Sequence, residues 1–255
     1  MTAANRKRVI IVTGGSEGIG FATCRKLAQG GAHVVMCARR EGPLTEAAAQ
    51  LGGLPGSVET IRLDVADSHA LTAFIHDVAA RHGRLDGLVN NAFQSVQSSI
   101  ADMSLDTWRQ SYAVNVEAPF VATKAAMAVM QPHGKGSIVN VASVSGIRAR
   151  ANASAYCSAK AALIQFSRVA ALEAGAHGIR VNSVIPGGTH SASFDKAFAD
   201  VPAEQMAQLE KAASPLGRFG QSDDVAEAIV FLLSDAARFM TGSEMHADGG
   251  AWLVR

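Results

Sequence analysis

The stretch TGGSEGIG, from Thr13 to Gly20, follows the apolar run Val9–Val12 and precedes an amphipathic segment. Its glycines let the backbone approach a ligand closely and let a strand and a helix pack tightly. The helix that follows would present free N–H groups and its positive dipole end to a pyrophosphate. The spacing is GxxxGxG rather than GxGxxG, so an ordinary tight loop is the alternative. The position between a strand and a helix favours a dinucleotide cradle.

Short apolar runs and longer amphipathic segments alternate along the rest of the chain. The short runs predict strands at Arg8–Thr13, His33–Ala38, Val58–Asp64, Leu85–Asn91, Gly136–Ala142, Arg180–Ile185 and Ser243–Ala247. The longer segments predict helices at Gly18–Gln29, Pro43–Leu51, Ser68–Arg81, Leu105–Met130, Ala153–Ala174 and Asp223–Leu233. Several strand runs lack apolar/polar alternation, which is typical of strands buried on both faces. The pattern predicts an α/β fold, a single Rossmann-type doubly wound parallel sheet of about seven strands flanked by helices on both faces.

No linker or repeat divides the chain, so residues 1–255 are expected to form one domain for dinucleotide binding and catalysis. One insert stands out after the sixth predicted strand. The segment at about 187–214 is polar and rich in alanine, and we expect it to form a substrate lid with one or two helices.

Composition excludes several other classes of function. The formal net charge is +1 and aromatic residues make up 5%, which argues against a nucleic-acid partner. No apolar stretch approaches the roughly 20 residues that span a bilayer, and the amino terminus lacks a signal-peptide pattern, so no membrane partner is expected. Three cysteines without a CxxC pair indicate a cytoplasmic protein, and histidines without HExxH or HxxxH spacing indicate no metal site.

A candidate acid/base group lies in AYCSAK, where Tyr156 and Lys160 are four residues apart and share one helix face. An ammonium beside a phenol lowers the phenol pKa and makes it a useful acid/base near neutral pH. Ser143 ends the strand-like run GSIVNVAS, at the edge where such sheets bind ligands. Its hydroxyl can donate to an oxygen that gains negative charge. Tyr156 and Lys160 alone would fit a solvated helix face; together with Ser143 and the glycine turn they indicate catalysis.

At this point the sequence resembles the classical branch of the short-chain dehydrogenase/reductase superfamily along nearly its whole length. The matching pieces, in order, are TGGSEGIG, Asp64-Val65, Asn90–Ala92, Asn115 in YAVNV, Ser143 in IVNVAS, YCSAK, Pro186–Gly188 and the tail from PLGRFG to ADGG. Each piece alone is a moderate signal, whereas the ordered set is highly specific.

The resemblance implies roles for individual residues. Tyr156 would exchange the substrate hydroxyl proton, Ser143 would hold the substrate oxygen, and Asn115 would fix a water in a proton relay reaching Lys160. Lys160 would also bind the nicotinamide ribose and lower the Tyr156 pKa. Asn90 would support the central sheet and the cofactor. The expected cofactor contacts are Gly14, Ser16, Glu17, Gly18, Ile19, Arg39, Arg40, Asp64, Val65, Asn91, Ala92, Tyr156, Lys160, Pro186, Gly187, Thr189 and Ser191.

Some of these positions have ordinary alternatives. Asn115 could be a plain polar helix residue, Asp64 could end a strand or cap a turn, and Thr189 and Ser191 could be simple lid residues. Two departures from the family pattern also matter. Phe93 stands where the family often has glycine, and either borders the substrate or packs under a loop. Glu17 stands where many NADP-preferring members carry a basic residue, and it could repel a 2′-phosphate.

The end of the second predicted strand decides the expected cofactor. An acidic residue there binds the adenosine ribose and excludes a 2′-phosphate, but this chain has Ala38. Arg39 and Arg40 follow, and a guanidinium binds phosphate in a fork geometry. NADP(H) is therefore the expected cofactor, with Arg39 as the main contact and Arg40 in support, and NAD(H) as the alternative. Both arginines could instead simply solvate the strand end, and Glu41 could pair with a basic neighbour.

The substrate is expected near Phe93, Gln94, Ser143 and Tyr156, beside a lid wall of Phe194, Phe198 and Met206. The lid residues could equally be the buried faces of short helices. Arg148 or Arg150 could bind an acidic group, although exposed surface arginines are commoner.

The leading function is NADP(H)-dependent hydride transfer with a small carbonyl or secondary alcohol substrate. An NAD-dependent alcohol dehydrogenase and a non-catalytic dinucleotide sensor are the alternatives. The family resemblance also implies a homo-oligomer, a tetramer or a dimer, formed through the helix that carries LIQFSRVAALEAG.

Overall fold

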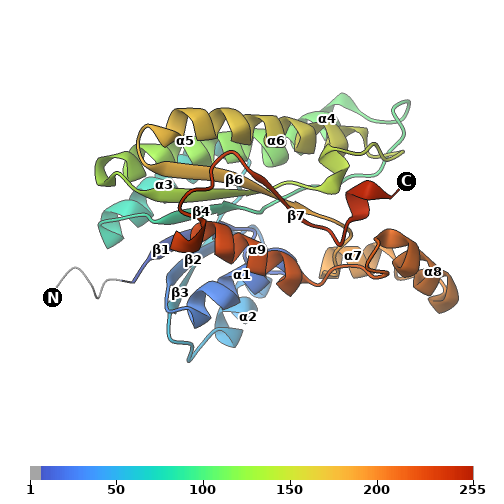
Figure 1. Cartoon of the computed structure of the whole chain (residues 1–255), viewed down its shortest axis with the longest axis horizontal. Helices are drawn as coiled ribbons and strands as arrows, with labels where there is room; N and C mark the ends of the chain where they lie inside the picture. The colour runs from blue at the N-terminus through green and yellow to red at the C-terminus, as the bar shows by residue number, and fades with distance from the viewer. Residues whose placement is uncertain (1–6, 255) are drawn as a thin grey trace.

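Seven parallel strands form one sheet with helices on both of its faces (Figure 1). The computed structural model describes residues 7–254, except for the side chains of residues 192, 193 and 197. Residues 1–6 and 255, the ends of the expected domain, lie outside the described residues. The fold class predicted from the sequence, a doubly wound parallel sheet, is confirmed.

The strands agree in number and order with the prediction. They are β1 (Val9–Thr13), β2 (His33–Ala38), β3 (Ser57–Arg62), β4 (Gly87–Asn90), β5 (Gly136–Val141), β6 (Ile179–Pro186) and β7 (Glu244–Ala247). β3 ends two residues before the predicted Asp64, because the Asp64 carboxylate accepts a hydrogen bond from the Ala66 N–H at 3.0 Å and turns the chain.

The strand order across the sheet is β3-β2-β1-β4-β5-β6-β7. The chain moves outward from β1 to β2 and β3, then returns to the other side of β1 with β4. Reversal of the winding beside the first strand opens a crevice at the carboxyl ends of β1 and β4. The glycine turn follows β1, so it lies at this crevice.

The helices are α1 (Gly18–Gln29), α2 (Glu41–Gln50), α3 (Ser68–His82), α4 (Leu105–Tyr112), α5 (Ala118–Met130), α6 (Ser154–Gly175), α7 (Ala192–Ala197), α8 (Ala203–Ala213) and α9 (Ser222–Leu233). α1, α2 and α9 cover one face of the sheet, and α3 to α6 cover the other (Figure 1). The single helix predicted over Leu105–Met130 is wrong in detail, because a π-helical turn, η2 (Ala113–Glu117), separates α4 from α5.

The core lies on both faces of the central strands. Ile10 and Val12 of β1 pack towards α1 and α9, whereas Val9 and Ile11 pack towards α3 and α5. All five residues of β1 are buried, which explains why its sequence lacks alternation. Burying one such side chain stabilises the fold by about 1.5–3 kcal/mol, so the centre of the sheet is the rigid base of the site.

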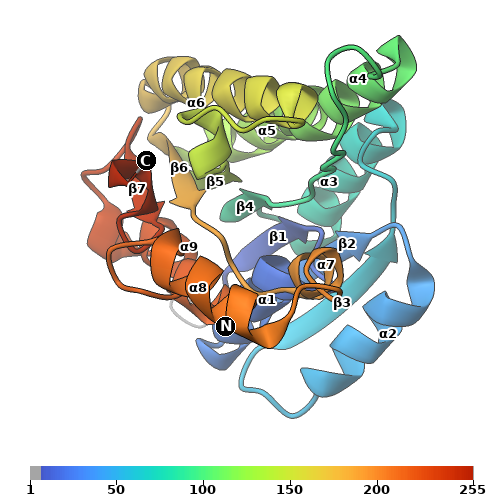
Figure 2. The ribbon, with the colours of Figure 1, turned by 90° about the vertical axis from the view of Figure 1, so that its right-hand side faces the viewer.

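The segment at about 187–214, expected to form a lid with one or two helices, carries two. α7 and α8 project from the end of the molecule where the strands of the sheet end, and α7 lies near the start of α1 (Figure 2). No residue of α8 is buried. The lid therefore packs far less tightly than the sheet to which it is joined.

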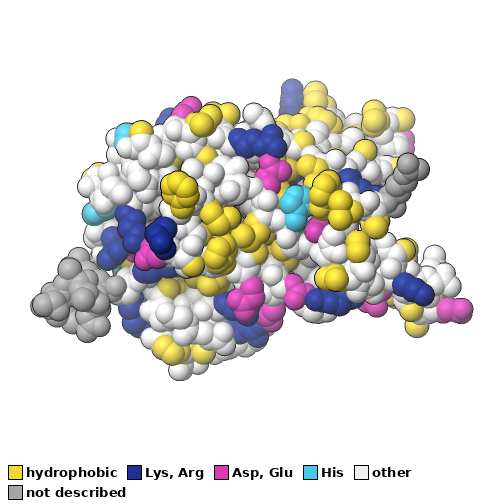
Figure 3. Space-filling view, in the orientation of Figure 1, with side chains coloured by type: hydrophobic (Ala, Val, Ile, Leu, Met, Phe, Trp, Pro, Cys, Tyr) yellow, Lys and Arg dark blue, Asp and Glu magenta, His cyan; other side chains and the backbone are white. Residues whose placement is uncertain are grey.

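The surface in Figure 3 mixes acidic and basic side chains and has no broad field of one sign. This agrees with the formal net charge of +1. Within residues 7–254, none of the helices has the length and apolar character needed to cross a membrane.

Candidate active site

The glycine turn joins β1 to α1 in a conformation that needs glycine. Gly14 and Gly18 have φ values of +65° and +54°, which side chains other than glycine rarely adopt. A Cβ at Gly20 would lie 2.1 Å from the Gly14 carbonyl oxygen, so the turn and the first helical turn are in direct backbone contact. No side chain caps the start of α1, where Glu17 is the N-cap residue. The first N–H groups of α1 are therefore available to an anion.

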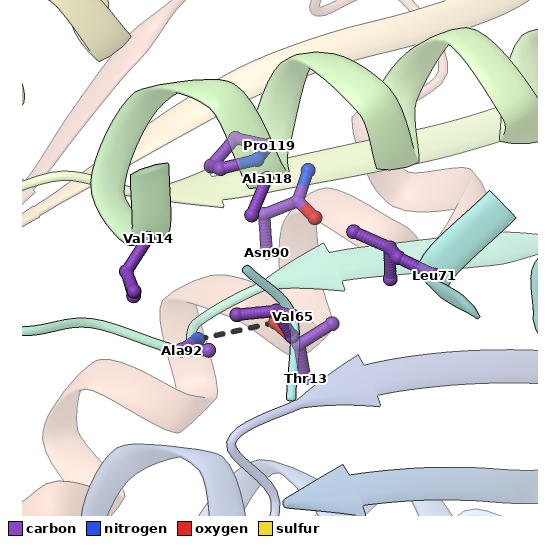
Figure 4. A pocket seen from close by; sticks show the side chains of 8 residues that line it. All are labelled: Thr13, Val65, Leu71, Asn90, Ala92, Val114, Ala118 and Pro119. Atoms are coloured by element: carbon purple, nitrogen blue, oxygen red, sulfur yellow. Dashed lines mark hydrogen bonds between the residues drawn. The ribbon is translucent and has the colours of Figure 1, made fainter. Parts of the chain in front are cut away.

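Thr13 and Asn91 tie this turn to the end of β4. The Thr13 hydroxyl accepts a hydrogen bond from the Asn91 backbone N–H at 3.0 Å. It accepts a second from the Ala92 backbone N–H at 3.1 Å, which Figure 4 shows. The Asn91 side-chain amide donates to the carbonyls of Thr13 and Gly14, both at 3.0 Å. Sequence reasoning did not assign Thr13. The sequence feature that points to Thr13 is a hydroxyl residue at the end of an otherwise apolar strand, directly before the glycines.

A small cavity lies behind this junction, with a volume of about 10 Å³, or roughly one water molecule. Its lining includes Thr13, Val65, Asn90 and Ala92 (Figure 4). Asn90 donates to the Asn140 side-chain oxygen at 2.8 Å, and thus braces β4 against β5 as expected. Val65 is buried, whereas Asp64 is exposed and caps its own turn. Asp64 therefore caps a turn, which is one of the two roles considered for it, and its contact with adenine stays a prediction.

The second strand ends with Ala38 opposite Arg62 of β3. Arg62 donates through Nε to the Arg39 carbonyl at 3.3 Å, so it is a third cation at this corner. Arg40 pairs with Glu17, with 2.6 Å between the guanidinium nitrogen and the carboxylate oxygen. The charge of Arg40 is therefore compensated by Glu17 of the glycine turn. Arg39 is exposed and has no ion pair among the described residues. Arg62 was missed because it comes from a different strand.

The catalytic candidates converge beside the carboxyl end of β5. Ser143 follows this strand, and Tyr156 and Lys160 lie on the first two turns of α6. Lys160 is 2% exposed, donates to the Val141 carbonyl at 2.8 Å, and has its Nζ 5.7 Å from the centre of the Tyr156 ring. The Ser143 hydroxyl is near enough to the Tyr156 phenol to lower the phenol pKa. The structure therefore brings together the three side chains that the sequence grouped.

Local environment shifts the pKa values of these groups. Burial is the largest influence and raises the pKa of Tyr156, while the nearby Ser143 hydroxyl and the charge of Arg150 offset part of this rise. Burial lowers the pKa of Lys160 to about 7. The expected lowering of the Tyr156 pKa by Lys160 is not found. Its amine points at the Val141 carbonyl, and its surroundings weaken its own positive charge.

Asn115 lies in the π-helical turn η2 and is fully buried. Its side-chain amide donates to the carbonyls of Gln94 at 2.7 Å and Ser111 at 2.9 Å, and its oxygen accepts from the Gln94 N–H at 3.3 Å. The side chain therefore fixes the loop that carries Phe93 and Gln94. The Phe93 ring is 48% exposed and meets the Tyr156 ring edge-on, with 6.4 Å between ring centres. This exposed position next to Tyr156 fits the interpretation that Phe93 borders the substrate.

The lid begins directly over the glycine turn. β6 ends at Pro186, Gly187 approaches Asp248, and the buried Thr189 hydroxyl donates to the Gly187 carbonyl at 3.1 Å. Ser191 caps α7, and its Cβ would lie 3.1 Å from a Cβ at Gly18. Ser16 and Ile19, on either side of this contact, are half-buried. The expected cofactor residues of the lid and of the turn are therefore neighbours.

The aromatic lid residues pack mainly on one another. The ring centre of Phe194 lies 4.6 Å from that of Phe198 and 4.8 Å from that of Phe219. His190 stacks edge-on against Phe194 and bridges Asp195 of α7 at 2.9 Å and Glu210 of α8 at 3.3 Å. Phe194 of α7, Phe198 directly after it and Met206 of α8 are thus half-buried.

The two arginines between Ser143 and Tyr156 have different surroundings. Arg148 donates to the Ala251 carbonyl and holds the carboxyl-terminal segment. Arg150 is exposed, and its charge acts on the Tyr156 phenol. Arg150 is therefore the one of the two that remains available to an anionic substrate group.

Known proteins resemble this chain along most of its length. The family model described as enoyl-(acyl carrier protein) reductase matches residues 14–251. The chain is 37% identical over 246 residues to 2-(S)-hydroxypropyl-CoM dehydrogenase 3 of Xanthobacter autotrophicus, which covers 96% of each chain. It is 35% identical over 243 residues to cyclopentanol dehydrogenase of Comamonas sp., which covers 95% of this chain and 96% of that one.

Solved structures agree with this relationship. A levodione reductase superimposes with a TM-score of 0.91 at 27% identity, over 97% of this chain and 98% of that one. A structure named as an NAD(P)-dependent gluconate 5-dehydrogenase of Beutenbergia cavernae, with NADP at low occupancy, gives a TM-score of 0.89 at 33% identity over 96% of each chain. The fold, the order of the site residues and these matches agree, and the chain belongs to the short-chain dehydrogenase/reductase family of oxidoreductases.

Proposed function

We propose that the protein transfers a hydride between NADP(H) and a small secondary alcohol or its carbonyl partner. The observation that carries the proposal is the Ser143–Tyr156–Lys160 group at the carboxyl edge of the sheet, beside the glycine turn. A non-catalytic dinucleotide sensor would have no use for this group.

The glycine turn fits a bound dinucleotide. A Cβ at Gly14 would lie 3.0 Å from the Ala92 Cα, and the start of α1 has no side-chain cap. A backbone pressed this closely together, with free N–H groups, suits a pyrophosphate. Further cofactor contacts are proposed from Asn91, whose amide is bonded to the turn, and from Thr189, which follows the end of β6. The bound nicotinamide would supply or accept the hydride.

In the proposed mechanism, Ser143 donates a hydrogen bond to the substrate oxygen, and Tyr156 gives or takes the proton on that oxygen. Ser143 and Arg150 favour this exchange because they offset part of the rise in the phenol pKa that burial causes. Lys160 would hold the ribose hydroxyls with the donors it does not use on Val141. Asn115 would bind the relay water through its main-chain carbonyl, because its side-chain amide is engaged by Gln94 and Ser111.

NADP(H) preference is supported by the missing carboxylate at Ala38 and by the exposed Arg39. Arg40 is already paired with Glu17, so its contribution is expected to be small. Arg39→Ala should lower kcat/KM for NADPH about tenfold or more and leave NADH turnover nearly unchanged, because a charge-assisted contact to the 2′-phosphate is lost. Arg40→Ala should lower it less than Arg39→Ala does, because Arg40 acts mainly by compensating the charge of Glu17. A clear NADH preference that Arg39→Ala does not alter would establish the NAD-dependent alternative.

The substrate proposed is a secondary alcohol with an apolar ring or chain. Phe93 beside Tyr156 offers an apolar contact, and one curated relative is named for cyclopentanol. Another relative is named for 2-(S)-hydroxypropyl-CoM, and Arg150 gives this chain a cation near the phenol. The test is a panel of cyclic alcohols, ketones and anionic hydroxy compounds with both cofactors, followed at 340 nm.

Tyr156→Phe should abolish turnover on this panel and leave cofactor affinity within about twofold. The protein has one other tyrosine, Tyr112, which stacks on Trp108 with 5.2 Å between ring centres. Tyr112→Phe is therefore a matched control that removes the same hydroxyl type away from Ser143 and Lys160. Turnover by Tyr156→Phe at a rate close to that of the unaltered protein would refute the catalytic assignment.

A homo-oligomer is proposed from the surface of α5 and α6. Phe120, Val169 and Leu172 are exposed by 50%, 43% and 82%, and Phe120 packs on Phe166 with 5.9 Å between ring centres. Together these apolar groups form a patch that a second subunit would cover. Light scattering should give a mass of two or four chains. A mass of one chain at micromolar concentration would contradict the assembly.

A further inference from the structure

Two histidines and one glutamate from three different elements meet at the amino-terminal end of β2. His33 begins β2 and pairs in register with Ser57 of β3, so Glu59 lies on the same face of the sheet. α3 covers this face and ends at His82. The topology thus brings three metal-ligating side chains together, although no two of them have ligand spacing in the sequence.

The donor atoms of this His33–Glu59–His82 cluster have the separations of a metal site. Glu59 Oε2 lies 3.5 Å from His33 Nε2 and 3.4 Å from His82 Nε2, and the three donors all lie within 4.8 Å of one another. Zinc bonds of 2.0–2.1 Å in a tetrahedron place neighbouring donors about 3.3 Å apart. Two of the three edges therefore match a zinc site before any adjustment of the side chains.

Among the described residues, one ring nitrogen of His33 has a hydrogen-bond partner and the other has none. Its Nδ1 is 2.7 Å from the Ser57 hydroxyl, which fixes the orientation of the ring. Its Nε2 is buried and has no hydrogen-bond partner among the described residues, because 3.5 Å to Glu59 is too long for a good bond. Metal-binding histidines show this arrangement, with a second partner that orients the ring towards the ion. A bound cation would satisfy this nitrogen.

Some charges around the cluster oppose the binding of a cation and others favour it. Arg81 bonds Glu59 Oε1 at 2.6 Å, which leaves Oε2 facing the histidines, and Asp77 offsets the Arg81 charge at 2.8 Å. Lys7 adds a positive charge on the His33 side. The carboxyl end of α3, where the chain turns at Gly83, contributes the negative end of a helix dipole. Arg81 and Lys7 are expected to lower the affinity for a metal ion without blocking the donor atoms.

We propose that His33, Glu59 and His82 bind one divalent transition-metal ion of the zinc class, with water as the fourth ligand. Two imidazoles and one carboxylate suit this class better than magnesium or calcium. The ion would join β2, the edge strand β3 and α3. Ala38 lies at the opposite end of β2, so the ion would stabilise the nucleotide-binding half and take no part in hydride transfer.

The test uses the untagged full chain, stripped with a chelator and titrated with Zn²⁺. We expect one ion per chain by equilibrium dialysis and elemental analysis, and a rise in Tm of about 5–10 °C at a hundredfold excess over Kd. Co²⁺ should give the visible spectrum of a four-coordinate site. His82→Ala should weaken Zn²⁺ binding at least about tenfold and abolish that spectrum, because it removes one of three ligands.

His76→Ala is the matched control, since His76 is an exposed histidine on the same helix. This variant should bind Zn²⁺ and Co²⁺ as the unaltered protein does. Glu59→Gln keeps the shape of the side chain and should also weaken binding, while circular dichroism checks that both ligand variants stay folded. Stoichiometry near zero, or equal Zn²⁺ affinity in the unaltered protein and His82→Ala, would overturn the proposal. Hydride transfer is independent of this result.

Discussion

Gly20→Ala is the sharpest test of how the glycine turn is built. The added Cβ would lie 2.1 Å from the Gly14 carbonyl oxygen and 2.5 Å from Asn91 Nδ2, whereas ordinary contacts begin at 3.4 Å. The backbone of the turn must therefore move by about 1 Å or more, because both neighbours are themselves held in place. Asn91 would then lose its hydrogen bonds to the carbonyls of Thr13 and Gly14.

The expected cost follows from these contacts. Overpacking a well-packed site costs about 1–3 kcal/mol, and each lost hydrogen bond costs about 1 kcal/mol. Gly20→Ala should therefore lower the free energy of unfolding by about 3–5 kcal/mol and Tm by roughly 10 °C. The displaced carbonyl and N–H groups would also weaken dinucleotide binding at least about tenfold.

Gly42→Ala is the matched control for this change. Gly42 lies in α2, and a Cβ there would meet no atom within 4 Å. The same substitution should leave cofactor affinity unchanged and raise stability by up to about 1 kcal/mol, because alanine favours the helix. Urea unfolding followed by tryptophan fluorescence and calorimetric titration with NADPH measure both effects. A Gly20→Ala protein with unaltered stability and cofactor affinity would refute the packing described for the turn.

Two further predictions concern the lid and the core. Asp195 and Glu210 raise the pKa of His190 by hydrogen bonding, so the stability that this histidine adds to the lid is fully present below its unfolded pKa of about 6.5 and is lost as pH rises through the raised folded pKa. Limited proteolysis of the lid should therefore be slower in the unaltered protein than in His190→Gln at pH 6 and equal at pH 9; a difference that persists at pH 9 would contradict this origin. Asn140→Ala removes two buried hydrogen bonds, to Asn90 and to Ser167, both 2.8 Å long, and should lower the free energy of unfolding by about 2–4 kcal/mol in urea titrations. A loss below about 0.5 kcal/mol would show that water replaces those bonds.

Much of the fold could be predicted because it depends on patterns local in the sequence. The fully apolar run Val9–Val12 and the glycines after it specify a buried strand, a tight turn and a helix, and all three are present. The π-helical turn at Asn115 could not be predicted, since one helical period runs through α4 and α5 and a single extra residue barely disturbs it. Its cause is a tertiary contact, the bonds between Asn115 and the Gln94 loop.

Parts of the site could not be predicted either, because they also depend on tertiary contacts. The sequence placed Glu17 and Arg40 near the adenosine ribose as opposing influences, but their pairing at 2.6 Å depends on how the glycine turn faces the end of β2. The His33–Glu59–His82 cluster needs the register of β2 with β3 and the length of α3. Ser143, Tyr156 and Lys160 were predictable because the order of these residues along the chain is itself a strong signal.

The loose attachment of the lid has a consequence for engineering. α8 has no buried residue, Phe194 of α7 packs on Phe219, and the preceding His190 is held by the Gly220 carbonyl and the Ser222 hydroxyl. β1 and β4, in contrast, have no exposed residue at which a change would be neutral. Libraries directed at residues 192–213 should therefore yield folded variants at high frequency and alter substrate range, while Arg39, after the end of β2, can be varied separately to change the proposed cofactor preference.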